Sequence, residues 1–204
     1  LMFYVLINDI IVLGDFMEIN IGVSNRHVHL TNETWKELFG DEEIQVRNYI
    51  SQPGQFASLS TVDVEFNGHV IEHVRVVGPI RKYNQIELSQ TDANVLGINP
   101  PRRQSGDLEC SLPINLIGPK GKVSLSEGCI LAERHIHMTP DMMEELHFTN
   151  EQVVNMYDIN HKLIFSSKIK RSDPGTLECH IDKDESQEYN LQTGDKLYID
   201  VENR

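Results

Sequence analysis

Cysteine is scarce in this chain, and the spacing of its few residues excludes two common roles. The three cysteines, Cys110, Cys129 and Cys179, are far apart, and none belongs to a Cys-x-x-Cys pair. An odd number of scattered cysteines does not make a disulfide framework and is typical of a protein in a reducing compartment. We therefore expect a cytoplasmic protein whose metal sites, if it has any, use histidine and carboxylate ligands.

Basic residues are also few, because 18 Lys and Arg stand against 31 Asp and Glu, for a net charge of −13. This balance excludes a duplex nucleic-acid binder, which needs a basic surface. It still allows a small anionic ligand held by a few local arginines. A length of 204 residues with 39% apolar content is enough for one large domain or two small ones with hydrophobic cores.

The sequence shows no membrane span and no secretory signal. Residues 1–16 (LMFYVLINDIIVLGDF) are apolar, but they contain Asp9 and Asp15, no Lys or Arg, and no small-residue cleavage site. We expect no membrane association and a first strand that begins near Met17. Residues 1–16 are then either a wrongly assigned start or a short targeting extension, which we expect to be a helix.

One motif occurs twice, as SNRHVHL over residues 24–30 and as AERHIHM over residues 132–138. Each copy places an arginine before two histidines that are separated by one β-branched residue. The pairs are His27 with His29 and His135 with His137. Side chains at i and i+2 of a strand share a face, so each pair supplies half of a metal site. Two such halves indicate two metals, or one metal shared between two half-domains.

The repeat includes a third donor. Residues 86–92 (IELSQTD) resemble residues 179–185 (CHIDKDE), and each segment puts a potential ligand at a strand end before a short acidic helix. By this analogy the ligand sets are His27, His29 and Glu87 in one half, and His135, His137 and His180 in the other. Three protein ligands with one open position are typical of a catalytic metal. The arginines of the repeat, Arg26 and Arg134, alternate opposite to the histidines and could brace the fold or bind phosphate.

Short strands and frequent turns predict the fold class. The clearest hairpin turns at Asn67-Gly68, between alternating segments at Val62–Phe66 and Val70–Val77. Thr31 and Thr139 are typical N-caps of short helices. Another strand is expected over Arg81–Leu88. The pattern predicts a mainly β protein made of two small β-barrels with short capping helices.

Several segments resemble the PduL-type phosphotransacylases, also called phosphate propanoyltransferases. The segments are Gly22–Leu30, Ser51–Ala57, Gly78–Lys82, Gln85–Ser89, Ser105–Leu108, Gly118–Gly121 and Arg134–Pro140. The resemblance implies exchange of phosphate and coenzyme A on a short acyl group: propanoyl-CoA or acetyl-CoA plus phosphate gives acyl phosphate plus CoA. Members of this family often travel inside bacterial microcompartments, which makes shell or core proteins expected partners. We also expect a homo-oligomer.

The resemblance further implies how the chain is divided. Residues 17–25 with 133–204 would form β-barrel 1, and residues 26–132 would form β-barrel 2, with a small hairpin insertion near residues 40–60. The metal sites would lie at the junction of the barrels.

By the same resemblance, two zinc ions are expected per chain. One would be held by His27, His29 and Glu87, where it can meet the CoA sulfur. The other would be held by His135, His137 and His180. Arg81 matches the phosphate-contacting arginine of the family, whereas no CoA-contacting residue is identified.

Phosphate is already a nucleophile at neutral pH, so we expect its direct attack on the thioester, assisted by metal and arginine, with no acyl-enzyme. Two other functions are open. One is a two-metal hydrolase acting on a thioester or an amide, and the other is a non-catalytic, metal-stabilised protein of a microcompartment. Histidine with one carboxylate favours zinc over cobalt or manganese.

Overall fold

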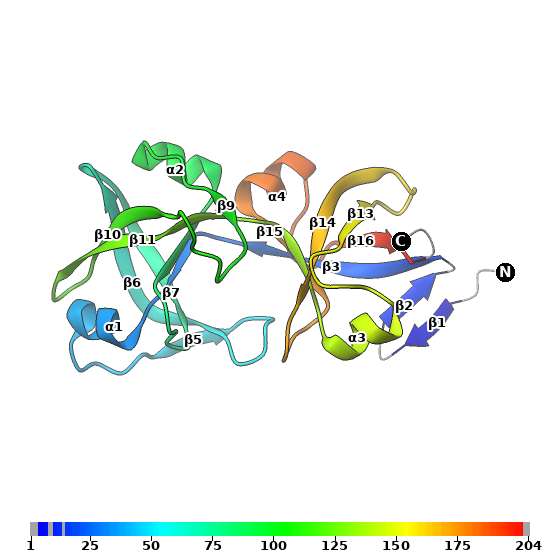
Figure 1. Ribbon diagram of the computed structural model, residues 1–204, viewed down its shortest axis with the longest axis horizontal. Coiled ribbons are helices and arrows are strands. Elements are labelled where there is room, and N and C mark those ends of the chain that lie inside the picture. The colour runs from blue at the N-terminus through cyan, green and yellow to red at the C-terminus, as the bar shows by residue number, and fades with distance from the viewer. Residues whose placement is uncertain (1–3, 8–9, 14, 202–204) are drawn as a thin grey trace. The chain divides into compact units, whose positions relative to one another are not determined.

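The structure is a computed structural model that describes residues 4–7, 10–13 and 15–201. It is mainly β and divides into two compact units (Figure 1). Unit 1 contains residues 1–24 and 134–204, and unit 2 contains residues 25–133. In each unit the described strands include a closed ring of six. The prediction of a mainly β protein with two small barrels and short helices is therefore confirmed.

Unit 2 is a barrel whose strands follow the order β10-β11-β8-β4-β7-β6 and close through pairing of β6 with β10. The ring strands are β4 (His27–His29), β6 (Phe56–Phe66), β7 (His69–Gly78), β8 (Gln85–Leu88), β10 (Leu112–Ile117) and β11 (Lys122–Ala132). Outside the ring, β5 (Val46–Tyr49) pairs with β6, and β9 (Arg102–Arg103) pairs with β11. The helices of this unit are α1 (Asn32–Phe39) and α2 (Gln90–Leu96).

Unit 1 closes in the order β3-β15-β12-β14-β13-β16, with β16 returning to β3. The ring strands are β3 (Phe16–Ser24), β12 (His135–Met138), β13 (Val153–Tyr157), β14 (Leu163–Arg171), β15 (Glu178–Asp182) and β16 (Lys196–Asp200). Its helices are α3 (Pro140–Glu145) and α4 (Lys183–Tyr189). None of the helices among the described residues is long and apolar enough to cross a membrane.

The helix expected within residues 1–16 is not formed by the described residues of this segment. Instead, β1 (Tyr4–Ile7) and β2 (Ile10–Leu13) pair as antiparallel strands, and β2 also pairs with the start of β3. A short apolar run fits a helix or a strand equally well, so periodicity alone could not separate the two. The remaining positions of this segment before Asp15 lie outside the described residues.

The two barrels repeat one pairing scheme. In unit 2, β4 lies between a parallel neighbour, β7, and an antiparallel neighbour, β8, and β8 pairs in parallel with β11. In unit 1, β12 lies between parallel β14 and antiparallel β15, and β15 pairs in parallel with β3. Along the chain β3 leads into β4 and β11 leads into β12. Each ring therefore includes the strand that precedes the histidine pair of the other ring.

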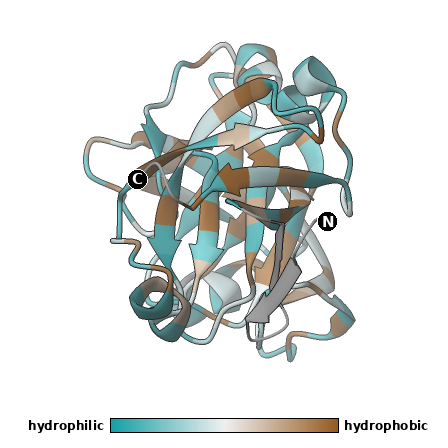
Figure 2. Ribbon diagram, turned by 90° about the vertical axis from the view of Figure 1, so that its right-hand side faces the viewer, coloured by the Kyte–Doolittle hydropathy of each residue, from teal (hydrophilic) through white to brown (hydrophobic). Residues whose placement is uncertain are grey.

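Strand alternation explains how the histidine pairs are held. The residue between the histidines, Val28 in β4 and Ile136 in β12, is fully buried in the core of its own barrel. Its two neighbours therefore face away from that core. Figure 2 shows the same alternation of apolar and polar residues along many strands.

The predicted hairpin at Asn67-Gly68 joins β6 to β7, and both turn residues have the positive φ that this turn needs (49° and 87°). Two boundaries were wrong. Strand β6 begins at Phe56, well before Val62, and β8 begins at Gln85, so that Arg81 precedes the strand.

Candidate metal centres

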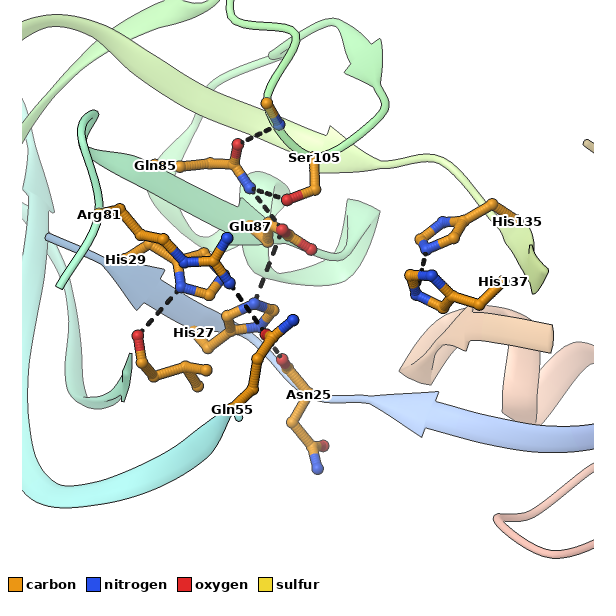
Figure 3. A network of polar contacts seen from close by, with 12 residues as sticks. Asn25, His27, His29, Gln55, Arg81, Gln85, Glu87, Ser105, His135 and His137 are labelled. Carbon is orange, nitrogen blue, oxygen red and sulfur yellow. Dashed lines mark hydrogen bonds and ion pairs between the residues drawn. The ribbon is translucent and has the colours of Figure 1, made fainter. Parts of the chain in front are cut away.

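The first centre contains His27, His29 and Glu87, all from unit 2 (Figure 3). Strands β4 and β8 are antiparallel, and their register places His27 opposite Glu87. The candidate ligand atoms of the three residues lie within 4.8 Å of one another, and His27 Nε2 is 3.6 Å from Glu87 Oε1. The structure thus brings together the three residues that the sequence repeat had grouped.

The two imidazoles of this centre are oriented through their Nδ1 atoms. His27 Nδ1 lies 2.9 Å from the carbonyl oxygen of Asn25, and His29 Nδ1 lies 3.0 Å from that of Val77. A carbonyl accepts only an N–H, so each Nδ1 carries the proton and each Nε2 is free to bind a metal. Burial, reinforced by the neighbouring His27, lowers the pKa of His29 to about 3. This histidine is therefore neutral at physiological pH, as a metal ligand must be.

Gln85 fixes the carboxylate of this centre. Its side chain is fully buried, and its amide nitrogen donates hydrogen bonds to Glu87 and, at 2.8 Å, to the Ser105 hydroxyl. Its amide oxygen accepts the N–H of Gly106 at 2.7 Å. Gln85 thereby links the loop at Ser105-Gly106 to the candidate ligand. Gln85 was not predicted as a site residue, although its position two residues before Glu87 places both on one face of β8.

Arg81 lies beside the first centre. Its backbone N–H donates to the carbonyl of Leu30 at 2.8 Å, and one terminal nitrogen donates to Gln55 Oε1 at 3.0 Å. Its positive charge also helps to lower the pKa of His29, after burial and the neighbouring histidine. Arg81 Nε is buried and has no hydrogen-bond partner among the described residues. A buried guanidinium N–H without an acceptor is suited to an anionic ligand.

The second centre contains His135, His137 and His180, all from unit 1. Strands β12 and β15 are antiparallel, and His135 lies opposite His180, as His27 lies opposite Glu87 in the first centre. The candidate ligand atoms again lie within 4.8 Å of one another. The His135 and His137 rings meet edge to face (Figure 3), and their Nε2 atoms are 3.0 Å apart.

His137 and His180 of this second centre have polar partners of their own. His137 Nδ1 contacts the Ser172 hydroxyl, and burial, with the charges of neighbouring histidines, lowers the pKa of His137 to about 2. His180 Nε2 lies 2.6 Å from Glu178 Oε2. Glu178, which precedes His180 by two positions on the same strand face, was not predicted as a site residue.

The arginines of the repeat anchor helix caps. Arg26 donates to Asp92 at 2.8 Å in unit 2, and Arg134 donates to Glu185 at 2.9 Å in unit 1. Asp92 and Glu185 each belong to the capping box at the start of a short helix, α2 and α4 respectively. These contacts favour the bracing role over phosphate binding.

The fold and its sites define a class: a protein of two six-stranded β-barrels that carry one candidate metal centre each. A family model described as phosphate propanoyltransferase matches residues 20–192. A phosphate propanoyltransferase of Thermotoga maritima is 43% identical over 183 residues, which are 88% of this chain and 87% of that protein. One of Lachnoclostridium phytofermentans is 40% identical over 182 residues, which are 88% and 85% of the two chains. The chain belongs to the phosphate propanoyltransferase family, as the sequence segments indicated.

Proposed function

We propose that this protein transfers a short acyl group, propanoyl or acetyl, between coenzyme A and phosphate. The observation that carries the proposal is the buried Nε of Arg81, which has no hydrogen-bond partner among the described residues. The positive charge of Arg81 also acts on the first centre, where it helps to lower the pKa of His29. An oxyanion beside the metal ligands is the group that such an arginine binds. The family membership supports the same reaction.

The donor sets fit zinc. His27, His29 and Glu87 would hold one ion, and His135, His137 and His180 would hold a second, because neutral imidazoles and a carboxylate are ligands that zinc accepts. Zinc would supply Lewis acidity towards a carbonyl oxygen and affinity for a thiolate sulfur. The placement of the metal sites at the junction of the two barrels stays a prediction.

Side chains of unit 2 bind and orient the phosphate. The Arg81 guanidinium binds phosphate oxygens and offsets their charge, and Gln55, which accepts its terminal N–H, fixes the direction of the fork. A phosphate oxygen attacks the thioester carbonyl carbon, the carbon–sulfur bond breaks, and CoA leaves as its thiolate. The products are acyl phosphate and free CoA.

No protein nucleophile is needed in this scheme. Burial raises the pKa of the Cys129 and Cys179 thiols to about 12, so neither is a thiolate at neutral pH. Neither buried thiol is therefore suited to act as a nucleophile, which fits direct attack by phosphate. Cytoplasmic or microcompartment location, homo-oligomer formation and partnership with shell or core proteins remain predictions.

The test is release of CoA thiol from acetyl-CoA and propanoyl-CoA on zinc-loaded protein, with and without phosphate. We expect release that requires phosphate, and for Arg81→Met a loss of roughly 100-fold in kcat/KM for phosphate, because one charged hydrogen-bonding fork is removed. Lys162→Met, which removes an exposed cation in the β13–β14 turn, is the matched control and should leave the rate unchanged.

The alternatives give different results. Thiol release without phosphate would indicate the two-metal hydrolase, and no release from either thioester would indicate the non-catalytic protein. Labelled acyl group that stays on the denatured chain would refute direct attack.

A further inference from the structure

One position differs between the two centres in a way that changes their charge. Gln85 lies opposite His29 in the β8–β4 register, and Glu178 lies opposite His137 in the β15–β12 register. Each of the two residues precedes the third candidate ligand by two positions. Gln85 and Glu178 therefore occupy the same place in two equivalent barrels, and one is a neutral amide where the other is a carboxylate.

This difference compensates for a difference in the ligand sets. The first centre has two histidines and Glu87, so a carboxylate belongs to its ligands, while its neighbour Gln85 is neutral. The second centre has three histidines and no carboxylate among its ligands, but Glu178 Oε2 lies 2.6 Å from His180 Nε2. With Glu178 included, each centre contains one carboxylate, on β8 in the first centre and on β15 in the second.

The neighbouring strand makes room for Glu178. In the β15–β3 register His180 lies opposite Gly22, and a Cβ added at Gly22 would be 2.8 Å from Glu178 Cδ and 2.9 Å from His180 Cδ2. At the equivalent place in unit 2, Ile130 lies opposite Glu87. Unit 2 thus has an isoleucine side chain at this position. Unit 1 has a glycine there, and a larger residue would collide with Glu178 and His180.

We propose that Glu178 is the anionic member of the three-histidine centre and sets its affinity for a divalent cation. Three neutral imidazoles offset none of the charge of such an ion, and the Glu178 side chain, only 12% exposed, places a carboxylate against them in a region of reduced dielectric. Removing a charged partner that contacts a metal ligand weakens metal binding by about 10- to 100-fold. This inference rests on the proposed function only in taking both residue sets as metal centres.

The experiment measures cation binding instead of turnover. Protein stripped with chelator is titrated with Zn²⁺ by calorimetry and with Co²⁺ by its visible absorption, in a His29→Ala background that removes the first centre. We expect Glu178→Gln to weaken binding at the remaining centre by about 10- to 100-fold. Gly22→Ala should weaken binding at the same centre by displacing Glu178 and His180, with no change of charge.

Two controls separate this effect from net charge and from misfolding. Glu188→Gln removes the same charge from an exposed position in α4 of the same unit, and it should leave the affinity unchanged. Glu178→Asp keeps the charge and should retain more affinity than Glu178→Gln. Far-ultraviolet circular dichroism establishes that each variant is folded.

Equal affinities for Glu178→Gln and Glu188→Gln would overturn the proposal, and so would a His29→Ala protein that binds no cation. The proposed function fails differently: thiol release would not depend on phosphate, even if Glu178→Gln changed cation affinity as expected.

Discussion

Arg134 is expected to stabilise unit 1 rather than bind substrate, and the variant Arg134→Met tests this. One terminal nitrogen of its guanidinium donates to Glu185 Oε1 at 2.9 Å, and Nε donates to the carbonyl oxygen of Ser166 at 2.9 Å. The guanidinium carbon also lies 4.9 Å from the centre of the Phe165 ring. One side chain, from the residue directly before β12, therefore joins β14 to α4.

The expected loss follows from these contacts. A hydrogen bond to a charged group contributes about 1.5–3 kcal/mol, and a cation–π contact adds about 0.5–1 kcal/mol. The Arg134 side chain is 28% exposed, so solvent screening reduces the sum to about 2–3 kcal/mol of unfolding free energy. For a chain of this size that corresponds to a fall in Tm of roughly 5–10 °C.

Calorimetric melting of zinc-loaded protein measures this loss, and phosphate kinetics complete the test. Arg134→Lys keeps the charge but loses the fork, so its Tm should lie between those of wild type and Arg134→Met. The KM for phosphate should be unchanged in both variants. Arg134→Met with an unaltered Tm and a raised KM for phosphate would refute the bracing role and would make Arg134 an anion-binding residue.

Two further predictions concern protonation and thiol reactivity. Burial lowers the pKa of His29 to about 3 and of His137 to about 2, so below pH 6.5 the unfolded chain binds protons that the folded chain does not. Zinc-free protein should lose up to about 1.4 kcal/mol per pH unit for each histidine as the pH falls from 6.5 towards 3, and a urea midpoint that is constant between pH 7 and pH 5 would contradict this. Of the three cysteines only Cys110 is exposed, so a thiol reagent should label native protein once and urea-unfolded protein three times. Rapid labelling of a second thiol in native protein would show that a barrel core opens.

Local signals in the sequence were sufficient for the turns and caps. Asn67-Gly68 predicted its hairpin because few residue pairs adopt positive φ so readily, and Thr31 and Thr139 cap their helices as expected. The residues at which strands begin were harder to predict from the sequence. Phe56 opens β6 because the strand pairs with Gly78 at the far end of β7, a partner that no local pattern identifies.

The grouping of the candidate ligands could largely be predicted because the chain contains the motif twice. A single His-x-His pair carries little information, but its recurrence with a preceding arginine directed attention to the strand that supplies the third donor. The structure brings both predicted triplets together, while their occupation by metal stays a prediction. Gln85 and Glu178 escaped notice because a polar residue on a strand has a meaning only once its cross-strand neighbours are known.

The two barrels share the contacts that the fold requires and differ in the residues that determine the chemistry of each centre. Both copies retain the arginine that anchors a helix cap, the capping acid and the threonine N-cap. These contacts hold each His-x-His strand in place and carry no information about the ion or the ligand. The copies differ at the third candidate ligand, Glu87 against His180, and at its neighbour, Gln85 against Glu178. In each barrel the two residues lie on one face of a single strand, β8 in unit 2 and β15 in unit 1. Two positions per barrel are therefore enough to make the two candidate centres chemically different within the same repeated fold.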